Sequence, residues 1–182
     1  MNENFDPSKI LIRASSMGCL FTEPRDAAAK KAGELSATAK THLIKVYIKE
    51  YWQREKDITT KQMDKGTTTE QDVITLAVRV LKRDFSKNEE RKSNEYATGH
   101  ADIVTEDEIL DVKSSWEAET FLPKLTESID KGYDIQLQTY MWLYDKPKAA
   151  LIYGLVDAPD HIIQNELRKL LFSLNVATEE AP

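Results

Sequence analysis

The hydrophobic pattern of this chain changes period along its length, and this change most limits the folds open to it. From Ser36 to about Glu55 the apolar side chains recur every three or four residues, which predicts an amphipathic helix with Ser36 as its N-cap. A second helical pattern follows Gly66 and continues to about Phe85. Residues 92–115 alternate instead, which predicts two or three short strands. This order indicates an α/β fold.

The remaining segments extend this α/β pattern. Residues 10–25 are expected to be extended or looped, residues 133–144 to form a third helix, and residues 149–156 to form a buried strand. A last helix is expected after Pro159, ending near Leu174. The prediction is a small mixed central β-sheet flanked by helices. It forms one domain over residues 1–182, with its core at about 10–175 and a tail, 176–182, that is disordered or truncated.

Composition excludes several classes of protein. With 1 Cys in 182 residues, neither a disulfide framework nor a four-cysteine zinc or iron–sulfur site can form within one chain. No apolar run approaches the roughly 20 residues of a membrane-spanning helix, and the N-terminus lacks the pattern of a signal peptide. These features predict a cytoplasmic protein. The net charge of −6 argues at first against a nucleic-acid partner.

That charge is unevenly distributed along the chain. Residues 1–100 hold 18 basic and 15 acidic residues, whereas residues 101–182 hold 7 basic and 16 acidic residues. Chance clustering of surface charge could produce such a difference. The acidic half, however, contains two carboxylates at positions where the pattern calls for apolar side chains.

Three acidic residues occupy such positions. Glu70 shares a helix face with Ile74, Ala77 and Leu81, and a carboxylate on a buried face is costly unless it is paired or bound to a cation. Glu70 also falls in the first turn of its predicted helix, so a favourable interaction with the helix dipole is the alternative. The other two residues, Asp102 and Asp111, interrupt predicted strands, where Asp is rare.

The two strand carboxylates are expected to face each other. A hairpin symmetric about Glu106 and Asp107 places Asp102 opposite Asp111, with Cβ atoms about 5 Å apart. Two carboxylates at that separation repel each other unless a cation lies between them or one holds a proton. Lys113 lies two residues beyond Asp111 and points to the same face. The all-oxygen ligand set favours Mg²⁺ or Mn²⁺ over zinc.

An acidic residue, any residue and then Lys is by itself a weak signal, because average composition yields about one instance in a chain of this size. A second instance, Glu90-Arg91-Lys92, is interpreted as a solvated run. The pattern at Asp111–Lys113 is stronger, because it lies in a predicted strand, is expected to face Asp102 and follows Glu70 in the sequence. The alternative is an α/β binding domain whose acidic residues are paired with Lys and Arg.

At this point the chain resembles the PD-(D/E)XK nuclease superfamily, in particular its phage lambda-exonuclease-like branch. That family has a core of one helix, three strands, one helix and one strand, and the resemblance covers residues 10–175. Four short motifs follow the family order: an acidic residue on a helix (Glu70), Gly-x-x-Asp (Gly99–Asp102), acidic-x-Lys (Asp111–Lys113) and Gln-x-x-x-Tyr (Gln136–Tyr140).

The resemblance implies roles for these residues. Glu70, Asp102, Asp111 and the backbone carbonyl of Val112 would hold one or two divalent metal ions, which polarise the scissile phosphate and activate water. Lys113 would position or deprotonate that water and offset phosphate charge. Relatives with an iron–sulfur cluster carry four cysteines, so this chain is expected to lack that cluster.

Two further groups of residues follow from the resemblance. Gln136 and Tyr140 lie four apart on one helix face and would flank the site, with core packing as the alternative for Tyr140. Arg13, Ser15 and Ser16 match the segment that receives a DNA phosphate in phage exonucleases, with an ordinary surface loop as the alternative.

The sequence therefore predicts a metal-dependent exonuclease that hydrolyses phosphodiester bonds at duplex DNA ends, with 5′-to-3′ polarity and a role in phage-type recombination, in a bacterial cell or a phage-infected host. By resemblance, its partners would be DNA ends, a single-strand annealing protein and further copies of the chain in a trimeric ring. The alternatives are a metal-dependent endonuclease on the same core and an inactive nucleic-acid-binding module.

Overall fold

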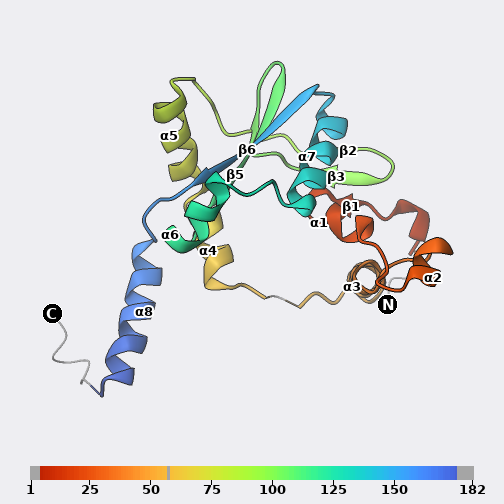
Figure 1. The fold of residues 1–182 in the computed structure, drawn as a ribbon, viewed down its shortest axis with the longest axis horizontal. Helices are drawn as coiled ribbons and strands as arrows, with labels where there is room; N and C mark the ends of the chain where they lie inside the picture. The colour runs from red at the N-terminus through yellow and green to blue at the C-terminus, as the bar shows by residue number, and fades with distance from the viewer. Residues whose placement is uncertain (1–4, 57, 176–182) are drawn as a thin grey trace. The chain divides into compact units, whose positions relative to one another are not determined.

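The computed structural model describes residues 5–56 and 58–175, which form a mixed α/β structure (Figure 1). Two compact units are present. Of the described residues, the first comprises 5–56, 85–111 and 128–152, and the second comprises 58–84, 112–127 and 153–175. The α/β class expected from the change of period is confirmed, with the strands divided between two three-stranded sheets. The expectation of one domain stays a prediction.

The first unit contains a sheet of strand order β1-β3-β2, which α1 and α7 contact, and further helices. β1 (Ile12–Arg13) runs parallel to β3 (Ala97–Gly99), whereas β2 (Lys92–Ser93) runs antiparallel to it. A core cluster of Ala14, Ala101, Ile109, Tyr140 and Tyr144 lies in this unit. Its helices are η1 (Pro7–Lys9), α1 (Ala14–Met17), η2 (Gly18–Phe21), α2 (Ala27–Lys31), α3 (Ala37–Trp52) and α7 (Lys131–Tyr144).

The other sheet has the strand order β4-β5-β6, with β4 spanning Ile103–Val104, β5 Glu108–Ser114 and β6 Lys148–Gly154. β4 and β5 are antiparallel, with Ile103 opposite Leu110 and Val104 opposite Ile109. This is the register predicted from the sequence. The division between the two units falls inside β5, between Asp111 and Val112.

The second unit is mostly helical. It contains α4 (Lys61–Thr68), α5 (Glu70–Leu81), α6 (Ala118–Phe121), η3 (Leu122–Leu125) and α8 (Asp160–Ser173). Val73, Ile74 and Ala77 form the buried face of α5, and Gly154 of β6 lies directly against Val73.

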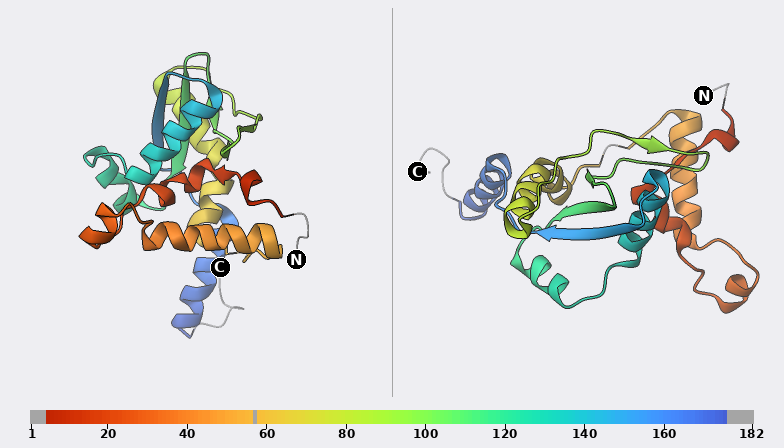
Figure 2. Two further views of the ribbon diagram at one scale, coloured as in Figure 1. Left: turned by 90° about the vertical axis from the view of Figure 1, so that its right-hand side faces the viewer. Right: turned by 90° about the horizontal axis from the view of Figure 1, so that it is seen from above.

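Helix α3 forms as predicted. The Ser36 hydroxyl accepts a hydrogen bond from the backbone N–H of Ala39 at 3.0 Å, so Ser36 is the N-cap. The helix ends at Gln53, which adopts a left-handed conformation with φ 53°. Figure 2 shows α3 as a straight helix with the N-terminal segment beside it, where Phe5 contacts Tyr47.

The helix predicted to follow Gly66 begins earlier and is broken. Thr60 caps α4 by accepting a hydrogen bond from the N–H of Met63, which places Gly66 inside the helix. Thr69 separates α4 from α5, and Lys82, with φ 53°, ends α5 before Phe85. The prediction was wrong here because a glycine inside a helix costs only about 1 kcal/mol, which the cap and tertiary packing offset.

Other boundaries shift by a few residues. Asp130 caps α7, so this helix starts before Tyr133, and β6 begins at Lys148 and ends at Gly154. Residues 10–25, expected to be extended or looped, contain β1, α1 and η2. The predicted tail, 176–182, lies outside the described residues. No helix of the described part is long and apolar enough to cross a bilayer.

Candidate active site

Asp111 is the buried carboxylate at the centre of the predicted site. Its side chain, on β5, is only 1% exposed. Continued by one residue, the pairing of Ile103 with Leu110 would bring Asp102, at the bend before β4, toward Asp111. Both carboxylates lie near the Tyr140 hydroxyl, since each of them raises the pKa of that phenol, so the hairpin brings two predicted metal ligands into one region of the first unit. Asp102 is half-buried and immediately precedes β4.

Gln136 and Tyr140 connect α7 to this carboxylate. The Gln136 amide nitrogen donates to Asp111 Oδ1 at 3.2 Å and lies 3.2 Å from the Tyr140 hydroxyl. The Tyr140 hydroxyl in turn donates to the backbone carbonyl of His100 at 3.1 Å. Burial, with the Asp111 carboxylate as the second cause, raises the pKa of the Tyr140 phenol well above its ordinary value. Tyr140 therefore acts as a neutral hydrogen-bond donor.

The segment that carries Asp102 is held by a residue that sequence reasoning missed, Tyr144. Its hydroxyl donates to the carbonyl of Glu90 at 2.6 Å and accepts from the N–H of Ala101 at 3.2 Å. Asn88 adds a second tie, because its backbone N–H donates to the Asp102 carbonyl at 2.8 Å. The available signal was the spacing, since Tyr144 is four residues beyond Tyr140 on the same helix face.

Gly99, the first residue of the Gly-x-x-Asp motif, is required by close packing. A Cβ atom at this position would lie 2.8 Å from Tyr140 Cε1 and 2.9 Å from Leu143 Cδ1. Because the Tyr140 ring is held by hydrogen bonds at its hydroxyl, it cannot move away without breaking them. The glycine thus lets β3 approach α7 closely enough for these bonds to form.

The second unit contains Glu70, Val112 and Lys113. Glu70 is the first residue of α5 and is half-buried; Ile74 on its predicted stripe is buried, whereas Leu81 is 48% exposed. Val112 is buried and Lys113 is half-buried, both on β5.

Two hydrogen bonds within the second unit connect the α4–α5 junction to the end of β5 and to Trp116 beyond it. The hydroxyl of Thr69, adjacent to Glu70, donates to the hydroxyl of Ser114, adjacent to Lys113, at 2.8 Å. Lys65 is 3% exposed, and its ammonium group donates to the Trp116 carbonyl at 3.0 Å. The α4–α5 junction is therefore fastened to the end of β5, and this brings the backbones of Glu70 and Lys113 near each other.

The residues present suit a hard divalent cation only in part. Asp102, just before β4, and Asp111, on β5, supply two carboxylates on one hairpin, and oxygen ligands of this kind fit Mg²⁺ or Mn²⁺. Within residues 5–56 and 58–175, no three His, Cys, Asp or Glu side chains form a group able to hold a metal ion. The predicted ligand set of Glu70, Asp102, Asp111 and the Val112 carbonyl therefore stays a prediction.

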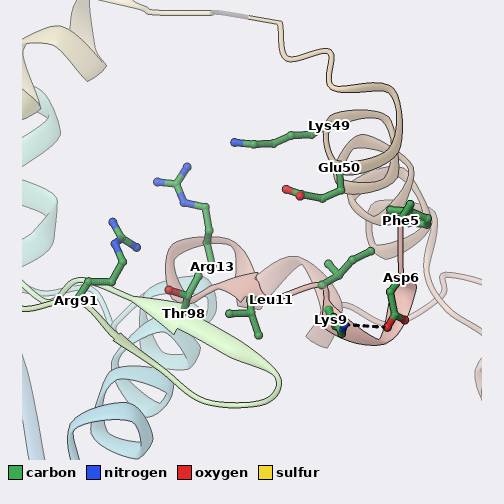
Figure 3. Close-up of a pocket in the computed structure, with 10 residues that line it drawn as sticks. Phe5, Asp6, Lys9, Leu11, Arg13, Lys49, Glu50, Arg91 and Thr98 are labelled. Atoms are coloured by element: carbon green, nitrogen blue, oxygen red, sulfur yellow. Dashed lines mark ion pairs between the residues drawn. The ribbon is translucent and has the colours of Figure 1, made fainter. Parts of the chain in front are cut away.

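The predicted phosphate contacts are separated by the structure. Arg13 lines a cavity of about 690 Å³ in the first unit (Figure 3). The hydroxyl of Ser16 is directed back to the chain, donating to the Arg13 carbonyl at 3.1 Å, and Ser15 is exposed. Neither serine is among the described residues that line the cavity.

Arg91, interpreted from the sequence as part of a solvated run, lines the same cavity. It precedes β2, which is brought near β1 by their common partner β3. This juxtaposition depends on the sheet topology, and no local signal in the sequence reveals it.

Comparison with known proteins agrees with this fold. A phage-related exonuclease from Haemophilus somnus 129PT superimposes with a TM-score of 0.73 and 30% sequence identity, over 85% of this chain and 72% of that one. No family model and no curated protein matches the chain.

An alkaline exonuclease from Laribacter hongkongensis shares the fold at 13% identity. It superimposes with a TM-score of 0.65 over 91% of this chain and 88% of that one, and with a TM-score of 0.63 when bound to dAMP. The fold and the 30% identity to the phage-related enzyme lead to one assignment: this chain belongs to the lambda-exonuclease-like family of PD-(D/E)XK nucleases.

Proposed function

We propose that this protein is a divalent-metal-dependent exonuclease that hydrolyses phosphodiester bonds at duplex DNA ends. The observation that carries the proposal is the buried Asp111 carboxylate, which is held by Gln136 and lies on the hairpin that Asp102 immediately precedes. Keeping a carboxylate charged in a buried position next to another is costly, and a divalent cation between them offsets that cost. The relation to a phage-related exonuclease supports the same reaction.

The chain's own residues would divide the work as follows. Asp102 and Asp111 hold the cation, with Glu70 and the Val112 carbonyl as the further ligands that the family resemblance implies. Bound Mg²⁺ or Mn²⁺ would supply a Lewis acid for the scissile phosphate. Lys113 brings a positive charge to the same face of β5 as Asp111, two residues away, where it offsets phosphate charge and orients the attacking water.

Gln136 and Tyr140 would act as positioning residues. Their hydrogen bonds fix the Asp111 carboxylate and the His100 carbonyl, so that the strand carrying Asp102 stays in register. Arg13 would receive a DNA phosphate, as a guanidinium group is suited to do. Ser15 and Ser16 remain candidates for the same contact.

The finer features follow from the family and are part of the proposal. They are 5′-to-3′ polarity, resection for phage-type recombination, a single-strand annealing partner, assembly as a trimeric ring, and action in the cytoplasm of a bacterial cell or infected host.

Digestion of end-labelled DNA tests the activity. With Mg²⁺, linear duplex is expected to lose nucleotides from its ends, whereas covalently closed circular duplex stays intact. Nicking of the circle would instead support an endonuclease, and no cleavage of either substrate would support an inactive binding module. Comparing a 5′ label with a 3′ label gives the polarity.

Replacing Lys113 tests the assigned site. Lys113→Ala is expected to lower the cleavage rate by at least about 100-fold, because the charge that offsets the phosphate is lost. Lys148→Ala, at an exposed position on β6, is the matched control and should leave the rate unchanged. Cleavage by Lys113→Ala at the wild-type rate would falsify the role of Lys113.

A further inference from the structure

The cavity that Arg13 lines is a basic pocket. Four cations border it, Lys9, Arg13, Lys49 and Arg91, together with the carboxylates of Asp6 and Glu50. In Figure 3, Arg13, Lys49 and Arg91 extend into one space from three different elements: the end of β1, helix α3 and the segment before β2. A net positive lining is notable in a chain with a formal charge of −6.

Two of these cations have no counter-charge in the described structure. Lys9 pairs with Asp6 at 3.7 Å, and Lys49 pairs with Glu55 at 2.7 Å. Within the described residues, the guanidinium groups of Arg13 and Arg91 form no ion pair and no hydrogen bond. Two such groups on one cavity attract an anion, and their planar forks match phosphate oxygens.

An aromatic cluster lies next to this pocket, formed by Phe5, Tyr47, Tyr51 and Trp52. The Tyr47 and Tyr51 rings stack with centroids 5.1 Å apart, and Trp52 lies 6.4 Å from Tyr47. Phe5 contacts both tyrosines edge-on and also lines the pocket, so the two features are continuous.

The aromatic cluster is open to solvent. Tyr47 is 42% exposed and Trp52 is 48% exposed, although the rings contact one another. Exposed aromatic rings beside unpaired arginines are the two components of a surface for single-stranded nucleic acid: the rings stack on bases and the cations contact the backbone.

We propose that the basic pocket and the aromatic cluster together bind single-stranded DNA, with phosphates at Arg13 and Arg91 and unpaired bases on Tyr47 and Trp52. The inference rests on the proposed function for its ligand, because a nuclease acting at duplex ends leaves an unpaired strand. Duplex DNA fits less well, since its bases are stacked on each other and offer no free faces to the rings.

The backbone connects this surface to the candidate active site. Thr98 lines the pocket and pairs with Arg13 across β1 and β3. Thr98 and Asp102 are four residues apart, so their Cα atoms are separated by at most about 14 Å, which corresponds to about four nucleotides at the ~3.4 Å rise of a strand. A strand held in the pocket could therefore belong to the same DNA molecule that is cleaved.

Equilibrium binding of a fluorescent oligothymidylate, followed by anisotropy in EDTA, tests the proposal without any cleavage. Wild type is expected to bind the oligonucleotide more tightly than a duplex of the same length. Arg91→Ala should weaken binding about tenfold and make the salt dependence shallower, by about 0.7 in the slope of log K against log salt. Arg91→Lys should recover most of the loss, and Arg79→Ala, at an exposed position on α5, is the matched control.

Trp52→Ala tests the proposed stacking of unpaired bases on the aromatic cluster. Loss of one stacking ring should weaken binding at least fivefold without changing the salt slope. Trp142→Ala, a tryptophan on α7 that is 55% exposed and lies outside the cluster, should bind like wild type. Circular dichroism confirms that each variant is folded, which is expected because Arg91 and Trp52 are exposed.

The outcomes separate this proposal from the proposed function. If wild type degrades linear duplex with Mg²⁺ but Arg91→Ala and Trp52→Ala bind the oligonucleotide as wild type does, the surface proposal is wrong and the nuclease stands. If wild type binds but does not cleave, the nuclease proposal fails and the surface stands. Equal affinity for duplex and single strand, or a Trp52→Ala variant that changes only the oligomeric state, would overturn the stacking role.

Discussion

At the scale of single residues, Gln136 has the most demanding position in the first unit. One amide nitrogen serves both the Asp111 carboxylate and the Tyr140 hydroxyl, and all three side chains are buried. A buried charged acceptor that loses a donor regains no hydrogen bond from water, so removing the amide costs more than a neutral bond contributes.

Gln136→Ala is therefore expected to lower the free energy of unfolding by about 1–3 kcal/mol, measured by urea denaturation. Gln138→Ala is the matched control, because Gln138 lies on the same helix and is exposed. A Gln136→Ala variant as stable as Gln138→Ala would show that Asp111 does not depend on this amide.

His42 on α3 provides the pH-dependent element. Its Nε2 atom is buried and has no hydrogen-bond partner among the described residues; burial, and secondarily Lys45, lower the pKa of the imidazole. The unfolded chain then binds more protons than the folded one around pH 6, so the stability that this group contributes is lost as the pH falls.

Replacing His42 by Gln should remove this component. The drop in melting temperature between about pH 7.5 and about pH 5.5 is expected to be smaller for His42→Gln than for wild type. Differential scanning calorimetry at both pH values measures it. An equal or larger drop in the variant would contradict the assignment.

At the scale of elements, the contact between β6 and α5 depends on the absence of a side chain. A Cβ atom at Gly154 would overlap both γ-carbons of Val73. Gly154→Ala is expected to destabilise the fold by about 1–3 kcal/mol, as overpacking of a core does.

A double-mutant cycle checks this explanation. Val73→Ala alone creates a cavity, but combined with Gly154→Ala it makes room for the new methyl group. The double variant should therefore be more stable than the sum of the two single losses predicts. Strict additivity, measured by urea unfolding, would mean that Gly154 is constrained by its backbone and not by Val73.

The α4–α5 junction depends on the buried Lys65. Lys61 and Lys65 both lie over the Trp116 ring, at 5.0 and 5.9 Å from its centroid, but only Lys65 is buried and donates to the Trp116 carbonyl. Lys65→Ala should cost about 1–3 kcal/mol of stability, whereas Lys61→Ala should stay within about 0.5 kcal/mol of wild type. Equal melting temperatures for the two variants would show that the hydrogen bond from Lys65 to Trp116 does not stabilise the α4–α5 junction.

Predictions from local pattern succeeded where the signal was local. The Ser36 cap, the α3 period and the Thr105–Glu108 turn fix α3 and the β4–β5 register, because each depends on residues close in sequence. The start of α4 and the break at Thr69 were missed, because the cap at Thr60 and the Thr69–Ser114 bond decide them and the latter is a tertiary contact. Arg91 was missed for the same reason.

At the scale of the whole molecule, a bound cation would change both the charge and the stability. The chain carries a formal charge of −6, and Asp102 and Asp111, on one hairpin, concentrate part of that charge in the first unit. A ligand that binds only the folded state stabilises it by about 2.7 kcal/mol at 100 times its dissociation constant.

Adding Mn²⁺ should therefore raise the melting temperature of wild type. Asp111→Asn is expected to abolish that rise, and Asp107→Asn, in the exposed turn of the same hairpin, is expected to keep it. An undiminished rise with Asp111→Asn would place the cation elsewhere. Because no cleavage is measured, this test is independent of the nuclease assay.

Helix α7 links these scales, and its buried face limits how the sequence can vary. Gln136 and Tyr140 hold the carboxylate and its opposing segment, and Tyr144 holds the Glu90 carbonyl, whose neighbour Arg91 borders the basic pocket. In a library of single substitutions selected for function, positions 136, 140 and 144 should accept very few alternatives, while the exposed Gln138 and Trp142 accept many.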